Sequence, residues 1–270
     1  MIRELLRELS DCLGENGEFE ARELLMYVTG MSLTEVTLNR NSEIPADKER
    51  EIRSLAARRM SGEPLQYIIG TAEFMGLEFA VTPDTLIPRQ DTETLVEAVL
   101  PYAKGTVLDI GCGTGCIGIS IAHFTDAEVT LLDVSEAALK IAAENAERNN
   151  VSVHCIKCDI LNDMPEGKFD MIVSNPPYIR TDVIETLDTD VKDHEPRAAL
   201  DGGEDGLVFY RRITDIAEKL LSDGGILAYE IGFDQGREVL EIVKDKFINA
   251  RLIRDYCGND RVIIAEKKNV

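Results

Sequence analysis

Residues 107–115 read Val-Leu-Asp-Ile-Gly-Cys-Gly-Thr-Gly. The apolar start predicts a buried strand, the glycines predict a tight turn, and the apolar run from Ile117 to Phe124 predicts a helix. A strand, a glycine-rich turn and a helix in this order are typical of a nucleotide-binding βαβ unit. Glycines in the turn allow the backbone to approach a bound nucleoside without clashes from Cβ atoms.

The spacing of this loop distinguishes two cofactors. The dinucleotide fingerprint Gly-x-Gly-x-x-Gly needs glycine at the position of Cys116, whereas this chain has Gly-x-Gly-x-Gly. Asp109 precedes the loop at the end of the strand, where a carboxylate suits the ammonium group of a methionine moiety better than a pyrophosphate. We therefore predict S-adenosylmethionine as the cofactor, with S-adenosylhomocysteine as its product, in preference to NAD.

Acidic residues also end the next two predicted strands, 129–132 and 151–156. The carboxylate of Asp133 is expected to accept hydrogen bonds from both ribose hydroxyls; the alternative is an acid that merely precedes a helix. Asp159 is expected to receive the adenine amino group, with Ile160 covering the adenine face. The alternative for Asp159 is a solvated loop acid.

Strands and helices alternate through the remainder of the chain. We expect strands at residues 107–110, 129–132, 151–156, 169–174, 226–231, 250–256 and 261–265. This alternation predicts a Rossmann-like α/β fold with a mainly parallel, doubly wound, seven-stranded sheet. The short turn Gly258-Asn259-Asp260 makes the last strand antiparallel to the one before it.

The chain before this sheet has a different pattern. Apolar residues in the first 60 positions recur at helical spacing, with Ser32 and Glu35 as a capping box and Pro45 at the start of a further helix. Short β-like runs follow, at Tyr67-Ile68-Ile69, Phe74-Met75 and residues 77–81, with a hairpin turn near Gly76. We divide the chain into a helical domain (1–64), a β-hairpin linker (65–87) and a catalytic domain (88–270).

The tetrapeptide Asn175-Pro176-Pro177-Tyr178 follows the predicted strand 169–174, at the sheet edge where open α/β folds place their sites. Its prolines stiffen the loop. The Asn175 side-chain oxygen and the Pro176 carbonyl are each able to accept one N–H of a planar NH₂ group, which orients that nitrogen for in-line methyl transfer. Tyr178 packs on the flat target group. The tetrapeptide therefore predicts transfer to an amide or amino nitrogen.

Composition narrows the substrate class. Fifty acidic residues oppose 29 Lys and Arg, for a net charge of −21, which disfavours binding to polyanionic nucleic acid. No apolar run approaches the roughly 20 residues needed to cross a bilayer, and the start of the chain lacks a signal-peptide pattern, so we expect a cytoplasmic enzyme. The three histidines and the Cys155-x-x-Cys158 pair match no metal-site spacing, so we expect core and loop cysteines and no metal.

These motifs together resemble the HemK/PrmC family of protein-(glutamine-N5) methyltransferases. Beyond the two general motifs, the resemblance rests on family-specific blocks: Pro64-Leu65-Gln66-Tyr67-Ile68-Ile69-Gly70, Ile87-Pro88-Arg89, Glu195-Pro196-Arg197-Ala198-Ala199-Leu200, Gly202-Gly203-Glu204-Asp205-Gly206, Tyr229-Glu230-Ile231-Gly232 and Gly258-Asn259-Asp260-Arg261. These blocks matter because Asn-Pro-Pro-Tyr also occurs in DNA adenine and ribosomal RNA guanine methyltransferases. Two departures are Gln90-Asp91, where the family usually has Pro-Glu, and Ile160, where an aromatic residue is common.

The resemblance implies the fold of a class I S-adenosylmethionine-dependent methyltransferase. The implied substrate is the glutamine of the Gly-Gly-Gln motif in a class 1 peptide chain release factor, held in part by the helical domain. The implied cofactor-binding residues are Gly111, Cys112, Gly113, Thr114, Gly115, Asp133, Asp159, Ile160 and Asn175. The implied catalytic residues are Asn175, Pro176 and Tyr178, which bind the substrate together with Pro177.

A nucleic-acid amino-methyltransferase and a non-catalytic nucleotide-binding module are the alternatives to glutamine methylation. Arg89, Glu93 and the block Glu195–Leu200 either act in the site or support the fold at a domain junction. We expect a monomer.

Overall fold

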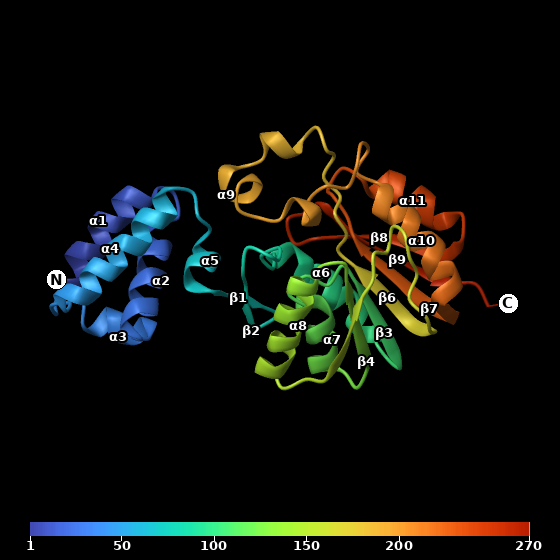
Figure 1. The fold of residues 1–270 in the computed structure, drawn as a ribbon, viewed down its shortest axis with the longest axis horizontal. Helices are drawn as coiled ribbons and strands as arrows, with labels where there is room; N and C mark the ends of the chain where they lie inside the picture. The colour runs from blue at the N-terminus through green and yellow to red at the C-terminus, as the bar shows by residue number, and fades with distance from the viewer. Residues whose placement is uncertain (270) are drawn as a thin grey trace. The chain divides into compact units, whose positions relative to one another are not determined.

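The computed structural model describes residues 1–269 and divides into two compact units (Figure 1). One unit comprises Met1–Gly70 together with Asp188–His194. The other comprises Thr71–Leu187 and the chain from Glu195 onward.

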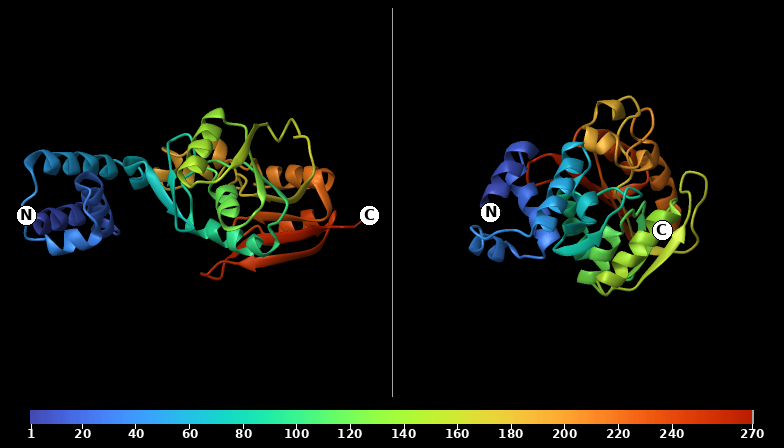
Figure 2. Two further views of the ribbon diagram at one scale, coloured as in Figure 1. Left: turned by 90° about the horizontal axis from the view of Figure 1, so that it is seen from below. Right: turned by 60° about the vertical axis from the view of Figure 1, so that its left-hand side comes forward.

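The first unit consists of short helices around an apolar core. Its helices are α1 (Ile2–Leu13), α2 (Gly17–Thr29), α3 (Leu33–Leu38), α4 (Ala46–Met60), α5 (Leu65–Ile69) and α9 (Thr189–Lys192). The core contains Leu9, Leu24 and Ile52 from α1, α2 and α4. Figure 2 shows the ribbons of these helices in dark to light blue. A largely buried ion pair between Arg59 and Glu20, 3.0 Å apart, joins α4 to α2.

Two predicted helix starts are confirmed in this unit. Ser32 Oγ accepts a hydrogen bond from the Glu35 N–H (3.3 Å), and Glu35 Oε2 accepts one from the Ser32 N–H (2.8 Å). This reciprocal pair is the capping box, and it satisfies two backbone donors at the start of α3. Pro45 directly precedes α4.

The predicted strand at Tyr67–Ile69 is wrong, because these residues belong to the single helical turn α5. Pro64 starts the turn, and Gly70 ends it in the left-handed conformation (φ 83°) with its N–H donating to the Gln66 carbonyl. Leu65 and Ile68, three positions apart, are both buried. The apolar run therefore belongs to a short helix. Three apolar residues are too few for their periodicity to distinguish a helix from a strand.

The predicted hairpin at Gly76 is confirmed. Strands β1 (Thr71–Phe74) and β2 (Leu77–Ala80) pair antiparallel across Met75 and Gly76, which have φ values of 54° and 72°. Positive φ at both central residues is the geometry that matches the twist of a two-residue hairpin. The Met75 N–H donates to Glu93 Oε1 (2.7 Å), which fixes the turn to the following helix.

The predicted seven-stranded sheet with an antiparallel last strand is also confirmed. Its strands are β3 (Thr106–Ile110), β4 (Glu128–Asp133), β5 (Val153–Lys157), β6 (Phe169–Ser174), β7 (Leu221–Glu230), β8 (Phe247–Arg254) and β9 (Asp260–Lys267). Their order is β5-β4-β3-β6-β7-β9-β8, and β9 runs antiparallel to both of its neighbours. The chain order reverses between β3 and β6, which makes their carboxyl ends the switch point where such sheets bind ligands.

Helices cover both faces of this sheet. The first face carries α6 (Gln90–Val99), α7 (Cys116–Phe124) and α8 (Glu136–Arg148); the second carries α10 (Val208–Leu220) and α11 (Gly236–Lys244). Short 3₁₀ turns lie at Leu100–Tyr102, Ile184–Thr186 and Arg197–Ala199. Because side chains alternate along a strand, Val107 lies in the first core and Leu108 in the second.

Asn145 connects three segments from within the first core. It is fully buried on α8, and its side chain bonds both the N–H (2.6 Å) and the carbonyl (3.0 Å) of Ala80. Its Nδ2 also donates to the Thr114 carbonyl in the glycine-rich turn (3.0 Å). The Asn145 side chain thus forms hydrogen bonds with backbone groups of both the hairpin and the glycine-rich turn.

We expect Asn145→Ala to lower the free energy of unfolding by about 2–4 kcal/mol, because buried backbone groups of Ala80 and Thr114 lose their partners. Urea denaturation followed by circular dichroism measures this change. Asn149→Ala is the matched control: Asn149 lies one turn later and bonds the Glu78 carbonyl in a more exposed position (3.0 Å). Its loss should be about 1 kcal/mol or less, and equal losses in both variants would contradict the role of Asn145.

Candidate active site

The glycine-rich turn leaves open space on one side. Gly111 and Gly113 have φ values of 71° and 53°, and a Cβ added at either position would meet no atom within 4 Å. At Gly115, in contrast, an added Cβ would lie 2.8 Å from the Ile119 side chain. The first two glycines therefore border a space that a ligand is able to fill, while the third allows the turn to pack on α7.

Strand β4 holds this turn in place. The N–H groups of Gly111 and Cys112 both donate to the Leu132 carbonyl (2.8 and 3.0 Å). The Asp133 carboxylate accepts from the Gly113 N–H (2.9 Å) through one oxygen and from the Ser135 N–H (2.9 Å) through the other. Asp133 thus shapes the turn itself, and each of its oxygens retains a further lone pair for a ligand hydroxyl.

Asp109 lies below the turn and is fully buried. Its Oδ2 accepts a hydrogen bond from the Gly118 N–H at the start of α7 (2.9 Å), while its buried Oδ1 accepts none from any described residue. Burial raises the pKa of this carboxyl to about 7, and the nearby charge of Asp133 adds to the effect. A buried carboxyl oxygen without a donor is unfavourable, so this arrangement fits a group that brings N–H donors or positive charge.

The remaining residues predicted to bind the cofactor are held by contacts within the protein. Asp159 closes its own turn, since its carboxylate accepts from the Leu161 N–H (3.1 Å) and from Asn162 Nδ2 (2.7 Å). The Ile160 side chain is buried in the core of the second face. Cys112 is buried in the first core, which raises its thiol pKa well above the ordinary value, and Thr114 is 2% exposed.

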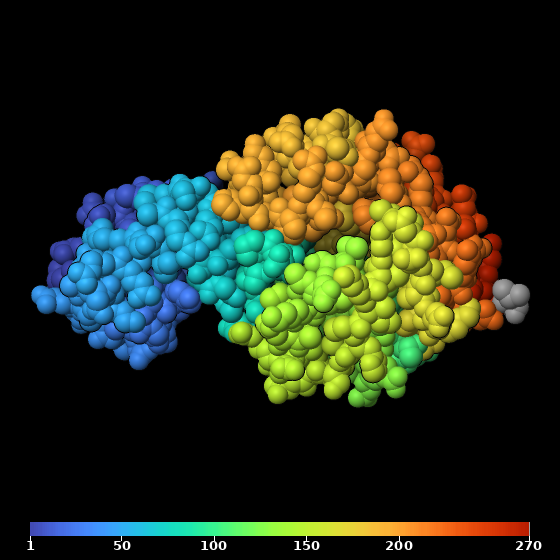
Figure 3. All heavy atoms as spheres, viewed as in Figure 1, coloured from blue at the N-terminus to red at the C-terminus, as the bar shows by residue number. Residues whose placement is uncertain are grey.

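Pairing in the sheet brings the tetrapeptide next to the glycine-rich turn. Ile110 at the end of β3 lies opposite Ser174 at the end of β6, and Ser174 Oγ donates to the Ile110 carbonyl (2.7 Å). The next residues along each strand, Gly111 and Asn175, therefore leave the sheet side by side. Figure 3 shows a recess in this unit between residues near 140–160, in green to yellow, and residues near 200, in orange.

Asn175 presents its acceptor without a protein donor. Its Nδ2 donates to Thr92 Oγ1 (3.3 Å), whereas its Oδ1 accepts no hydrogen bond from residues 1–269. The Pro176 carbonyl likewise has no donor among those residues. Both acceptors predicted to hold a target NH₂ group thus have open hydrogen-bonding capacity.

The rest of the tetrapeptide loop is tightly held. The Tyr178 carbonyl accepts from Gln235 Nε2 (3.0 Å). A Cβ added at Gly202 would lie 2.8 Å from the Pro177 carbonyl oxygen and from the Tyr178 Cα, so only glycine fits at this contact. The loop geometry is therefore fixed by segments that follow it in the chain.

Sequence reasoning missed Glu230, which ends β7. Ser174 lies opposite Tyr229, so Glu230 emerges beside Asn175, on the same face of the sheet as Ala228. Glu230 is 1% exposed, and burial raises its pKa to about 7 against the hydroxyl of Thr92 and the charge of Arg261. The period-2 alternation of Ile226, Ala228 and Glu230, combined with parallel pairing, was the signal that would have identified it.

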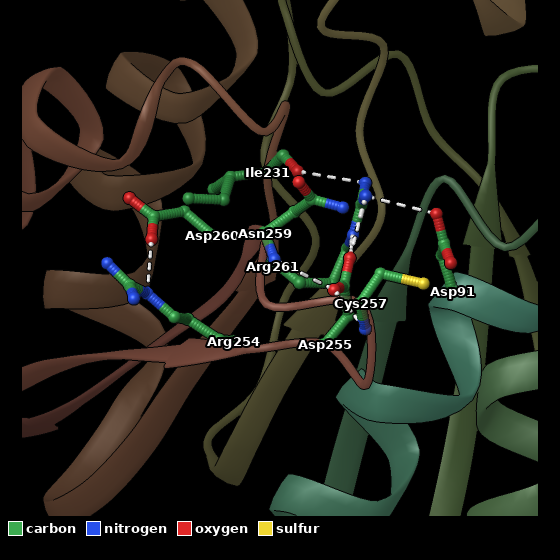
Figure 4. Close-up of polar contacts among 8 residues, drawn as sticks. All are labelled: Asp91, Ile231, Arg254, Asp255, Cys257, Asn259, Asp260 and Arg261. Carbon is green, nitrogen blue, oxygen red and sulfur yellow. Dashed lines mark hydrogen bonds and ion pairs between the residues drawn. The ribbon is translucent and has the colours of Figure 1, made fainter.

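Arg261 joins three elements around this edge (Figure 4). Its guanidinium donates to Asp255 Oδ2 (3.1 and 3.2 Å) and lies 3.0 Å from Asp91 Oδ2 at the start of α6. It also reaches the Ile231 carbonyl just after β7 (3.5 Å). The Arg261 cluster, defined as Arg261, Asp255, Asp91 and Ile231, therefore sets the position of α6 against the end of β7.

The residues of undecided role make contacts within the same unit. Arg89 forms an ion pair with the buried Glu195, and Glu93 holds the hairpin turn described above. Arg197 is half exposed and pairs with Glu185 (3.0 Å). The contacts of Arg89 and Glu93 thus lie at the start of α6, whereas that of Arg197 joins the turn Arg197–Ala199 to the turn Ile184–Thr186.

Two further features are absent from residues 1–269. In that range, no helix is both long and apolar enough to cross a membrane, and no group of three or more His, Cys, Asp or Glu side chains is arranged to hold a metal ion. Cys155, expected in the core, is exposed, because β5 is an edge strand of the sheet.

Solved structures share the architecture of the sheet-containing unit. A methyltransferase from Pyrococcus furiosus aligns with a TM-score of 0.56 and 22% identity, over 79% of this chain and 98% of the other. A Thermus thermophilus 16S ribosomal RNA N2 G1207 methyltransferase, in complex with AdoMet and guanosine, aligns with a TM-score of 0.52 and 19% identity, over 73% of this chain and 50% of the other. The fold is that of the class I methyltransferases.

Sequence families and relatives identify the chain more closely. Residues 2–70 match the PrmC N-terminal domain, and residues 89–222 match the Methyltransferase small domain. A release factor glutamine methyltransferase of Geobacter sulfurreducens is 42% identical over 92% of this chain and 89% of its own length. That of Clostridium acetobutylicum is 41% identical over 97% and 96%. With both domains matched and this identity along nearly its whole length, the chain belongs to the release factor glutamine methyltransferase family.

Proposed function

We propose that this protein transfers a methyl group from S-adenosylmethionine to the side-chain amide nitrogen of the glutamine in the Gly-Gly-Gln motif of a class 1 peptide chain release factor. The observation that carries the proposal is the pair of open acceptors, Asn175 Oδ1 and the Pro176 carbonyl, beside the open turn at Gly111. The similarity to enzymes named for release factor glutamine methylation supports the choice of acceptor.

The residues at the turn fit the proposed cofactor. Bound S-adenosylmethionine supplies an electrophilic methyl group on a positively charged sulfur, next to an amino acid moiety and a nucleoside. The buried Asp109 Oδ1 is suited to its ammonium group, and the remaining lone pairs of Asp133 are suited to ribose hydroxyls. We assign the rest of the cofactor site to the turn Gly111–Gly115, to Asp159 and Ile160 at the adenine, and to Asn175 near the methyl group.

The tetrapeptide orients the acceptor nitrogen. A glutamine amide nitrogen is a weak nucleophile because its lone pair is delocalised into the carbonyl. Asn175 Oδ1 and the Pro176 carbonyl each accept one of its two N–H groups, Pro177 stiffens the loop, and Tyr178 packs on the amide plane. These contacts would orient the nitrogen toward the methyl group. Fixing this orientation before the reaction lowers the entropic part of the activation barrier. The nitrogen becomes acidic only on methylation and then loses one proton to solvent water, so no base is required before transfer.

We assign the helical domain (1–64) to holding the release factor, the segment 65–87 to linking, and residues 88–270 to catalysis. A net charge of −21 disfavours direct nucleic-acid binding. We propose a monomer that acts where translation terminates, in the cytoplasm.

Methyl-labelled S-adenosylmethionine offered to three acceptors tests the reaction. The acceptors are a release factor, the same factor with its motif glutamine changed to alanine, and DNA. We expect label in the intact factor alone, located on the glutamine by peptide mass spectrometry. Label in DNA, or equal label in both forms of the factor, would contradict the proposal.

Asn175→Ala tests the role of the tetrapeptide. We expect kcat to fall by at least about 100-fold, because one of the two acceptors that orient the nitrogen is lost. Calorimetry should find S-adenosylmethionine affinity within about threefold of wild type, a difference of less than 1 kcal/mol. A near-normal kcat would remove Asn175 from the mechanism.

Asp109→Asn tests the buried carboxyl through its pH dependence. The Asp109 pKa is raised from 3.8 to about 7, so its contribution to stability is fully present below pH 3.8 and is lost as pH rises through 7. We expect the ligand-free variant to gain stability relative to wild type between pH 5 and pH 8, by a few kcal/mol at about 1.4 kcal/mol per pKa unit. The same variant should bind S-adenosylmethionine more weakly at pH 8. If the difference in the free energy of unfolding between wild type and Asp109→Asn were the same at pH 5 and at pH 8, this role of Asp109 would be refuted.

A further inference from the structure

The function of Asn175 depends on which way its side-chain amide faces. An amide carries one acceptor atom and a two-proton donor, at nearly the same positions. If the amide turned over, its NH₂ group would face the NH₂ group of the target glutamine, and no hydrogen bond would form. Something in the site must therefore select one of the two orientations.

Thr92 is the neighbour that contacts this amide. It lies on α6, is 2% exposed, and its Oγ1 receives the Asn175 Nδ2 hydrogen bond (3.3 Å). A hydroxyl group is both a donor and an acceptor, so Thr92 by itself would stabilise either orientation of the amide. To select one orientation, a further group must accept a hydrogen bond from the Thr92 hydroxyl, so that only the oxygen of Thr92 is left for Asn175.

Glu230 supplies that group from the end of β7. Its carboxyl lies near the Thr92 and Tyr178 hydroxyls, which lower its pKa against the effect of burial, while its buried Oε2 accepts no hydrogen bond from any described residue. An ionised carboxylate only accepts, so a Thr92 hydroxyl proton directed at Glu230 leaves the Thr92 oxygen to accept from Asn175. The Arg261 cluster holds α6, and hence Thr92, against the end of β7.

We infer that Glu230 and Thr92 are positioning residues that fix the Asn175 amide with its oxygen toward the substrate nitrogen. This inference rests on the proposed function and adds two residues that never contact the reacting atoms. The direction of donation runs from Asn175 to Thr92 and from Thr92 to Glu230. Glu230 thereby fixes the direction of the Thr92 hydroxyl, and the Thr92 hydroxyl fixes the orientation of the Asn175 amide.

The relay depends on the ionisation of Glu230. Other ionisable groups that face this residue are Asp91 on α6, Cys116 on α7, Tyr178 after β6, Tyr210 on α10 and Arg261 on β9. Protonated Glu230 becomes a donor to Thr92 Oγ1 and competes with Asn175 for it. The Thr92 proton is then able to turn toward Asn175 Oδ1, which favours the wrong orientation of the amide.

Thr92→Val tests the relay because it removes the hydroxyl while keeping the shape of the side chain. At saturating S-adenosylmethionine and release factor, we expect kcat to fall on the order of 10-fold to 100-fold, as for a misplaced reacting group. Cofactor affinity should remain unchanged, and Thr92→Ser should recover most of the rate. Thr214→Val is the matched control: Thr214 is equally buried on the opposite face and bonds the Tyr229 hydroxyl (3.1 Å), so its kcat should equal that of wild type.

The pH profile provides a readout that loss of packing would not move. Wild-type kcat should fall as pH drops through about 7, where Glu230 gains its proton. Glu230→Gln cannot ionise and presents a donor as well as an acceptor, so it no longer selects one direction of the Thr92 hydroxyl, and we expect a lower kcat that is flat between pH 6 and pH 8. An acid limb that persists in Glu230→Gln would overturn the assignment of Glu230.

The side-chain amide resonances of Asn175 test the orientation without any turnover. In ¹⁵N-labelled protein saturated with S-adenosylhomocysteine, these resonances should shift in Thr92→Val and Glu230→Gln and stay in place in Thr214→Val. Unchanged resonances, or shifted resonances with normal kcat, would overturn the inference. Failure of the proposed function would look different, since the wild-type enzyme itself would then leave the release factor glutamine unlabelled.

Discussion

The position of β6 between β3 and β7 is the constraint on which the site depends. Parallel pairing aligns the carboxyl ends of these three strands, so that Gly111, Asn175 and Glu230 leave the sheet at one edge. Residues separated by more than 100 positions thereby meet without any long side chain reaching across a gap. The chemistry of the site follows from which residue ends each strand.

Two buried carboxyl groups mark this edge. Asp109 and Glu230 each carry an oxygen that no described residue satisfies, and burial raises both pKa values to about 7. An apolar residue at either position would avoid this desolvation penalty. Perturbed pKa values of this kind cluster at functional sites, and both groups lie at the edge where the glycine-rich turn and the tetrapeptide leave the sheet.

Contacts outside the site determine how accurately it is built. The Arg261 cluster and the Glu93 bond to the hairpin turn both end on α6, the helix that carries Thr92. Gly202 and Gln235 hold the tetrapeptide loop from later parts of the chain. Segments far apart in the sequence therefore hold the elements around Asn175 in place.

The sequence by itself determined the glycine-rich turn, the tetrapeptide, the capped helices and the seven alternating strands, because each is set by local periodicity or by the backbone preferences of glycine and proline. It failed at Tyr67–Ile69, where three apolar residues fit a strand and a helical turn equally well. Only the tertiary structure decided that Asp133 bonds the turn, and that Thr92 meets Asn175 across 83 residues of chain. The reason is physical. Periodicity predicts on which face of its own helix or strand a side chain lies, whereas the meeting of distant residues depends on how the strands pair and where the helices cross them.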